Sequence, residues 1–187
     1  ALEKWLYDTP KALKDSPVLQ LLQDSPTHGD LNADNILVDS GRRTWLIDFG
    51  RTGYGYRLRD FAELESCIAL DLPGEAGVAA LVEFEKVVFG QERWEDGVVL
   101  PANLETLVGN EDLIKAIHVV QELRTLAGQW QEDGYDMRRY YLALLFEAVL
   151  RLVTEGRDSP AQAPLPARRA HALLRVATII EKLGRAD

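Results

Sequence analysis

Apolar residues recur at helical spacing along most of this chain. In four long segments they fall at positions i, i+3, i+4 and i+7, the pattern of an amphipathic helix that buries one face. The four segments are residues 75–89, 111–131, 136–155 and 167–183. A weaker pattern over residues 2–23, interrupted by two prolines, predicts one or two short helices near the start. The pattern therefore predicts a chain that is mainly α-helical.

The pattern changes near residue 35. Two short apolar runs, residues 36–38 and 44–47, flank an Asp-Ser-Gly turn, which is typical of a small β-hairpin. The expected fold class is therefore mainly α with one small β-hairpin (α+β). The glycine-rich stretch that follows, residues 50–55, predicts a loop.

A further helix is expected to start at Asp60. Glu63 follows it by three residues, and this spacing is typical of a capping box, in which the two side chains satisfy free amides at the start of a helix. The helix is predicted to run from Phe61 to about Leu70 and to end near Pro73.

Composition limits the classes of function. The 187 residues, 47% of them hydrophobic, are enough to bury one substantial core. The formal net charge of -9 argues against a nucleic-acid partner, because neutralising phosphates requires clustered Lys and Arg. A cationic or neutral ligand fits this charge better than a nucleic acid does, although an acidic surface that only keeps the protein soluble is the more common cause of such a charge.

Other features of the sequence bear on the cellular compartment of the protein and on whether the chain is one piece of a longer protein. Cys67 is the single cysteine and cannot form an internal disulfide, which favours the reducing cytoplasm. No run approaches the about 18 apolar residues of a membrane span, so neither membrane insertion nor secretion is expected. Because the sequence begins at Ala1 rather than Met, we expect it to be one piece of a longer protein.

The strongest chemical signal lies in residues 28–35, His-Gly-Asp-Leu-Asn-Ala-Asp-Asn, followed after the hairpin by Ile-Asp-Phe-Gly. Asp30 and Asn35 are five residues apart, and Asp48 follows Asp30 by 18 residues. Phosphoryl transfer requires a base that orients the attacking hydroxyl and hard oxygen ligands that hold Mg²⁺ on the phosphates. These three side chains can supply both.

The two motifs resemble the protein-kinase-like superfamily, whose catalytic loop reads H-x-D-x-x-x-x-N and whose metal loop reads D-F-G. The resemblance implies that Asp30 is the catalytic base and that Asn35 and Asp48 bind Mg²⁺. It also implies that Leu37 and Ile47 contact the nucleotide, ATP or another NTP. Two regions follow from it: catalytic and metal loops at residues 28–50, and a helical substrate subdomain at residues 60–187.

Within the superfamily, the chain looks like the aminoglycoside phosphotransferase and choline kinase group, which phosphorylates small-molecule hydroxyls. Gly29 replaces the usual arginine of H-R-D, and the nine residues 51–59 leave no room for a peptide-docking segment. The resemblance implies that Asp60 and His28 support the catalytic loop. Strings at residues 46–55 and 59–65 also resemble a kinase-like domain of bacterial conflict-system proteins, the ternary-complex-associated domain.

A complete kinase also has a glycine-rich loop and a strand lysine over the phosphates. The 27 residues before His28 contain neither, and Asn32 stands where protein kinases keep a phosphate-contacting lysine. We therefore expect a kinase-like carboxy-terminal lobe without its amino-terminal lobe, which would be supplied by another segment or an adjoining domain.

Two classes of function remain open. The first is an ATP- and Mg²⁺-dependent phosphotransferase that transfers the γ-phosphate to a small-molecule hydroxyl. The second is a non-catalytic interaction or scaffold domain of a larger bacterial protein. A minor alternative treats His28, Asp30 and Asp48 as a transition-metal site. His118 and His171 lie in predicted helices and are interpreted as satisfied or exposed helix residues.

Overall fold

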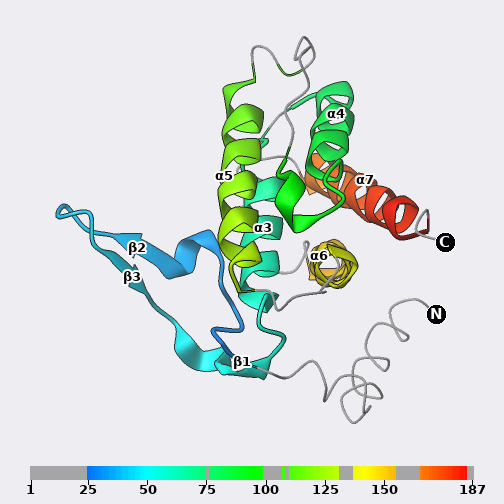
Figure 1. Ribbon diagram of the computed structural model, residues 1–187. Coiled ribbons are helices and arrows are strands. Elements are labelled where there is room, and N and C mark those ends of the chain that lie inside the picture. Colours follow the sequence, from blue (N-terminus) through cyan, green and yellow to red (C-terminus); the bar gives the residue numbers. More distant parts are fainter. Residues whose placement is uncertain are drawn as a thin grey trace. The chain divides into compact units, whose positions relative to one another are not determined.

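The computed structural model describes residues 25–74, 76–98, 107, 110–130, 137–154 and 165–184 (Figure 1). It confirms a mainly α-helical fold, with two small antiparallel sheets. The chain forms two compact units, Ala1–Asp60 and Phe61–Asp187. The helices predicted for residues 2–23 lie outside the described residues.

The first unit contains the predicted hairpin. Its strands β2 (Ile36–Val38) and β3 (Thr44–Leu46) pair antiparallel, with Leu37 opposite Trp45. Asp39 fixes the turn, because its Oδ1 accepts hydrogen bonds from Gly41 N at 2.8 Å and from Arg43 N at 3.0 Å. Such aspartate turns stabilise a reversal of the chain without help from distant residues.

The second sheet was not predicted. Strand β1 (Ser25–Thr27) pairs antiparallel with β4 (Gly53–Gly55), so the prediction that residues 50–55 form only a loop is wrong. Two short 3-10 helices, η1 (Ala33–Asn35) and η2 (Phe49–Arg51), complete this unit. The β1–β4 pairing is made between segments 26 residues apart, and a three-residue strand leaves no local pattern to reveal it.

The second unit is built from helices, and every predicted helix is confirmed to within a few residues at its ends. In chain order these are α3 (Arg59–Asp71), α4 (Val78–Val88), η3 (Trp94–Asp96), α5 (Glu111–Gly128), α6 (Met137–Thr154) and α7 (Leu165–Gly184). The first two residues of α3 belong to the first unit. None of the helices in the described ranges is both long and apolar enough to cross a membrane.

Helix α5 illustrates why these boundaries could be predicted. Asn110 caps it by accepting from Leu113 N at 3.2 Å, and Glu111 and Asp112 follow in the first turn. A polar cap and acidic residues at a helix start satisfy free amides and favour the helix dipole.

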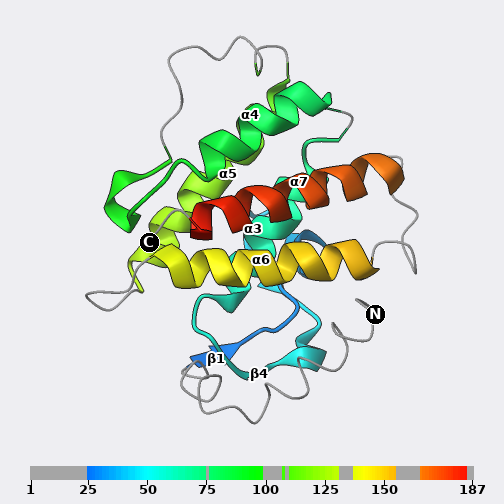
Figure 2. The same cartoon turned by 90° about the vertical axis from the view of Figure 1, so that its right-hand side faces the viewer.

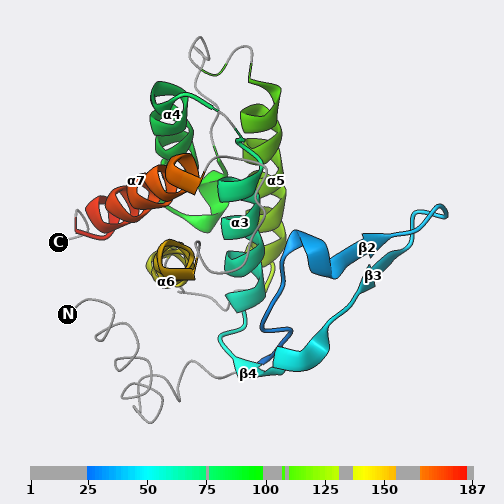
Figure 3. The same ribbon diagram turned by 180° about the vertical axis from the view of Figure 1, so that it is seen from behind.

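The helices surround a core in which α3 runs through the middle of the unit. Helix α5 lies alongside α3 in the front and back views (Figures 1 and 3), and α6 and α7 pack against each other along their lengths (Figure 2). Phe84, Leu113, Ile117 and Leu144 are fully buried between these helices. Cys67 is also buried and is not part of a disulfide.

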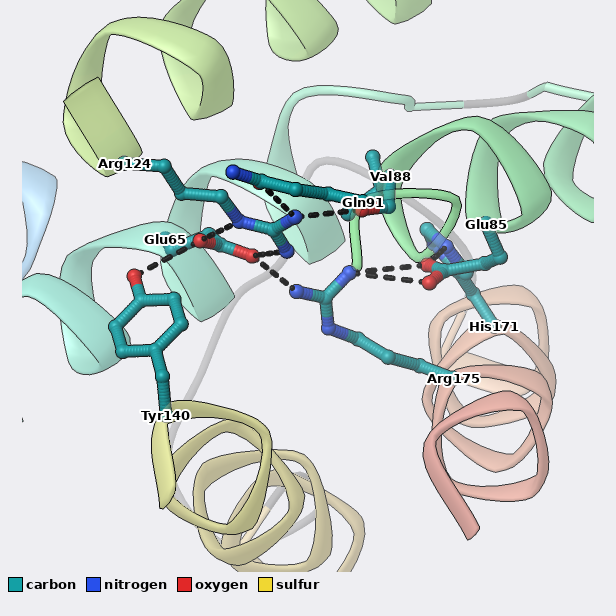
Figure 4. Close-up of polar contacts among 8 residues, drawn as sticks. All are labelled: Glu65, Glu85, Val88, Gln91, Arg124, Tyr140, His171 and Arg175. Carbon is teal, nitrogen blue, oxygen red and sulfur yellow. Dashed lines mark hydrogen bonds and ion pairs between the residues drawn. The ribbon is translucent and has the colours of Figure 1, made fainter. Parts of the chain in front are cut away.

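A network of charged side chains crosses this core (Figure 4). Glu65 of α3 is fully buried and accepts from Arg124 of α5 at 2.9 Å (Nε) and 2.7 Å (NH2). Tyr140 of α6 donates its hydroxyl to Glu65 at 2.8 Å, and Arg175 of α7 donates to it at 3.1 Å. One carboxylate therefore binds side chains from three other helices.

The network continues to α4. Arg175 also donates to both carboxylate oxygens of Glu85, at 3.2 and 3.1 Å, and His171 Nε2 donates to Glu85 Oε1 at 2.7 Å. His171 is thus a satisfied buried histidine, as interpreted from the sequence, whereas His118 is exposed. The two arginines balance the two glutamates in charge, so burial does not leave an isolated ion.

The pKa of Glu65 reflects competing effects. Burial raises it, but the attraction of Arg124 and Arg175 and the hydrogen bonds from Arg124 and Tyr140 outweigh burial and leave the pKa below its ordinary value. The same attraction raises the pKa of Arg124, against a burial effect that lowers it. Both groups are therefore charged in the folded protein at neutral pH.

We predict that Arg124→Met destabilises the protein by about 3–5 kcal/mol, because it leaves the Glu65 carboxylate buried without its main partner. The midpoint and slope of urea unfolding measure this. Lys86→Met is the control, since Lys86 pairs with Glu83 on the surface and its loss should cost under about 1 kcal/mol. Equal effects of the two substitutions would contradict a special role for the buried pair.

We also predict that stability declines as the pH falls below about 4.5. The folded-state pKa of Glu65 lies below its unfolded value, so the stability that it contributes is complete above the unfolded pKa. That stability is lost as the pH falls through the folded pKa. Urea midpoints at pH 6, 5, 4 and 3.5 test this in wild type and in Tyr140→Phe, which removes one hydrogen bond to the carboxylate. The variant should show the shallower decline; identical pH profiles would contradict this assignment.

Candidate active site

The first unit holds every residue that the sequence predicted for the site. His28 and Asp30 lie between β1 and η1, and Asn35 ends η1. Leu37 lies in the middle of β2, Ile47 and Asp48 follow β3, and Asp60 lies in the first turn of α3. Asn35, Ile47 and Asp48 therefore directly flank the hairpin at the end opposite its turn.

Asp60 holds the loop that carries His28. Its two carboxylate oxygens accept from His28 N at 2.7 Å and from Gly29 N at 3.0 Å. The prediction that Asp60 caps the following helix is corrected, because α3 already begins at Arg59 and both oxygens are directed at the loop. Arg59 adds a bond from the same turn, donating to the Gly29 carbonyl at 3.0 Å.

Gly29 is required by the backbone at this point. Its φ is +80°, and a Cβ on it would lie 2.3 Å from the carbonyl oxygen of Arg51. A side chain there would be both strained and in contact with a neighbouring carbonyl. This explains physically why glycine stands where related loops have arginine.

Two backbone groups of Ile47 form hydrogen bonds with other residues of the candidate site. His28 is buried and donates from Nε2 to the Ile47 carbonyl at 2.8 Å, while Ile47 N donates to the Asn35 carbonyl at 3.1 Å. The next residue, Asp48, adopts a left-handed conformation with φ 60° and ψ 62°. Non-glycine residues adopt it infrequently, and such strain is often found at functional sites.

Asn35 is oriented by Asp30. Its Nδ2 donates to the Asp30 carbonyl at 2.8 Å, so its Oδ1 points away from that contact. Asn32 shapes the same loop, because its Oδ1 accepts from Asp34 N at 3.0 Å and from Asn35 N at 3.3 Å. The structure therefore connects Asp30 to Asn35 through a side-chain hydrogen bond to a carbonyl, and Asn35 to Ile47, the residue before Asp48, through a backbone hydrogen bond.

The donor set fits Mg²⁺. In the described part of the chain no hydrogen-bond donor contacts Asn35 Oδ1 or the Asp48 carboxylate. Magnesium takes one or two protein oxygens and completes its shell with phosphates and water, so two free oxygens suffice. Over the same residues no three His, Cys, Asp or Glu side chains could hold a metal ion, so His28, Asp30 and Asp48 do not form the alternative transition-metal site.

Sequence reasoning missed Arg51. Its NH1 lies 3.3 Å from Asp30 Oδ1, so the two side chains form an exposed ion pair. The contribution of such an exposed pair to stability is small, at most about 1 kcal/mol. Arg51 directly follows the Asp-Phe-Gly motif, and that adjacency is the signal that could have identified it.

The structure is that of a mainly α-helical domain in which carboxylate and amide side chains lie on the loops next to a small hairpin. The model of the ternary complex associated domain 9 family matches residues 5–153. The chain belongs to this family.

Other known proteins are similar over a shorter stretch. The aminoglycoside 3'-phosphotransferases of Escherichia coli and Salmonella typhimurium are each 42% identical to this chain over 53 residues, which is 26% of this chain and 20% of each relative. The match thus spans about a fifth of the length of these relatives. No solved structure matches the chain.

We predict that Asp60→Ala costs about 2–3 kcal/mol, because it removes a charged acceptor from two loop amides. Faster hydrogen exchange at the amides of His28 and Gly29 should accompany the loss of stability. Asp60→Asn, which keeps one acceptor oxygen, should recover part of both effects. Asp34→Asn on the exposed side of η1 is the control, and slow exchange at both amides in Asp60→Ala would contradict the assignment.

Proposed function

We propose that this domain catalyses ATP- and Mg²⁺-dependent phosphoryl transfer to a hydroxyl group of a small molecule. One observation carries the proposal: the hydrogen-bonded circuit that joins Asp30 to Asn35 and Asn35 to Ile47, the residue before Asp48. This circuit fixes the backbone around the three oxygen-bearing side chains and leaves the oxygens of Asn35 and Asp48 without a protein donor, so a ligand can reach them.

Each side chain has a distinct role in this proposal. Asp30 orients the acceptor hydroxyl and accepts its proton, since its carboxylate is partly exposed and can be reached by a ligand. Asn35 and Asp48 would hold Mg²⁺, which neutralises charge on the transferred phosphoryl group. His28 and Asp60 position the loop through the backbone contacts described above.

The similarity to aminoglycoside 3'-phosphotransferases supports the class of reaction. It covers only about a fifth of those proteins, so the remaining parts of a phosphotransferase would have to come from another segment or an adjoining domain. The partly exposed side chains of Leu37 and Ile47 would then contact the nucleotide from this domain's side.

A non-catalytic role as a binding domain is the second candidate. The ion pair between Arg51 and Asp30 favours it, because Asp30 Oδ1 already accepts from a protein donor at the position where a substrate hydroxyl would have to bind. The description of the family as a ternary complex associated domain also favours association with partners. Measuring the turnover of ATP distinguishes the phosphotransferase from the non-catalytic binding domain.

We predict that Asp30→Asn in the full-length protein lowers kcat about a hundred- to ten-thousand-fold, the usual contribution of a general base. The KM for ATP should change only a few-fold, because Asp30 acts on the transition state rather than on bound nucleotide. Phosphate transfer from γ-labelled ATP measures both. A variant as active as wild type would exclude the mechanism, and no turnover by any form would favour the binding domain.

Binding of Mg²⁺–ATP provides a separate check on the metal ligands. Asp48→Ala should weaken it at least about tenfold, because one of two protein oxygens is lost. Asp34→Asn is the matched control, since Asp34 lies on the exposed side of the same loop. Equal affinities in all forms, measured by calorimetry at millimolar nucleotide, would exclude Asp48 as a ligand.

A further inference from the structure

Helix α6 has apolar side chains on two opposite sides. One side packs into the core of the helical unit, where Tyr140 and Leu144 are fully buried. On the opposite side, four large hydrophobic residues are between 41% and 55% exposed: Leu142, Phe146, Leu150 and Val153. Residues three or four positions apart lie on one side of a helix, so these four form a continuous row. A surface helix ordinarily carries polar residues on its outer side, so α6 has an apolar side that the described part of the unit leaves uncovered.

Helix α7 exposes two residues of the same kind. Leu173 is 58% exposed and Ile180 is 55% exposed, two turns apart along the helix. Helices α6 and α7 pack against each other and form an outer layer in front of α3 in Figure 2. Elsewhere in the described part of this unit, exposed large hydrophobic residues lie only at or near the ends of α4 and α5: Val78, Leu126 and Trp130. The six exposed residues of α6 and α7 are called the α6–α7 apolar surface below.

The spacing of apolar residues on α6 is that of a helix that pairs with another helix. The residues follow one another at intervals of four, three and four positions, as in a heptad repeat: Leu142, Phe146, Val149 and Val153. These intervals read the same in both directions. A second α6 that runs antiparallel therefore places Leu142 opposite Val153 and Phe146 opposite Val149, and each pair joins a larger side chain to a smaller one. The row is thus complementary to itself, which a two-fold symmetric dimer requires.

The charges at the ends of α6 also suit antiparallel pairing. Arg138 and Arg139 are exposed in the first turn, which has no acidic residue, so their positive charge opposes the dipole of their own helix. In an antiparallel pair they lie near the last turn of the second α6, whose free carbonyls carry partial negative charge. Arg151 in that last turn is engaged with Asp71 of α3 at 3.4 Å. A parallel pair would instead bring the four arginines of two first turns together, so the charges favour the antiparallel arrangement.

The exposed area is large enough for a stable dimer. Each residue of the α6–α7 apolar surface is about half exposed, so at about 150 Å² for a large side chain the six present roughly 450 Å². Two copies would bury roughly 900 Å² of apolar surface. Because homodimer interfaces are about 65% apolar, the total would be about 1,400 Å², within the usual range of about 1,200–2,000 Å² for a stable interface.

We propose that a second copy of this chain covers the α6–α7 apolar surface and that the two copies pair through antiparallel α6 helices. The inference is independent of the proposed function, because none of the candidate site residues lies on α6 or α7. A two-fold dimer of this kind carries two candidate sites in one assembly. It gives the domain an association role whether or not it turns over ATP.

Sedimentation velocity of the full-length protein from about 1 to 100 μM tests the dimer. Wild type should sediment as a dimer, and Phe146→Arg should raise the dimer dissociation constant at least about thirtyfold, because it places a charge in the centre of the interface. Leu126→Arg is the matched control, since Leu126 is 48% exposed on α5, and it should leave the dimer intact. Unchanged circular dichroism of Phe146→Arg would show that the variant is folded.

Cross-linking tests the antiparallel register. A protein with both Leu142→Cys and Val153→Cys should form a disulfide-linked dimer on mild oxidation, whereas neither single variant should. The two positions are 11 residues apart on one helix, about 16 Å, so they cannot form a disulfide within one chain. Cross-linking of a single variant would indicate parallel helices and overturn the proposed pairing. A wild-type monomer at every concentration, which would mean that another part of the protein or a different partner covers the surface, would overturn the dimer, as would a dimer that Phe146→Arg does not weaken.

Discussion

The helical unit depends on one carboxylate that has no access to water. Glu65 accepts hydrogen bonds from side chains on α5, α6 and α7, and it can remain charged only while those donors stay in place. Apolar contacts alone would tolerate small sliding of one helix past another, because dispersion is not directional. A bidentate arginine contact is directional, so the Glu65–Arg124 pair fixes the rotation of each helix as well as its distance.

A second carboxylate on the same helix organises the other unit. Asp60 belongs to the first unit and Glu65 to the second, five residues apart along α3. Asp60 satisfies two backbone amides of a loop, whereas Glu65 satisfies side chains of a core. Helix α3 thus supplies one organising anion to each unit, and each unit obtains its geometry from contacts within itself.

The hydrophobic pattern was enough to predict the helices and the hairpin, because amphipathic periodicity and turn chemistry are local properties. The β1–β4 sheet could not be predicted, since its pairing joins distant three-residue strands. The sequence indicates the buried network of charged side chains only ambiguously. Arg124 and Arg175 occupy buried positions on otherwise apolar helix faces, but long charged side chains at such positions more often extend to solvent. Their partners on other helices were not predictable from the sequence.

The candidate site differs from both organising carboxylates in how its oxygens are used. The hydrogen bonds that build it run mainly through backbone groups: the carbonyls of Asp30, Asn35 and Ile47 accept, and the amides of His28 and Gly29 donate. The side-chain oxygens of Asn35 and Asp48 take no part in this scaffold. Asp39, Asp60 and Glu65, in contrast, have both carboxylate oxygens engaged by protein donors. A buried carboxylate must be satisfied within the fold, because a buried unpaired anion is costly. Asp48 is exposed, so its carboxylate needs no protein partner, and under the proposed function it and the Asn35 oxygen are the groups available to a cation.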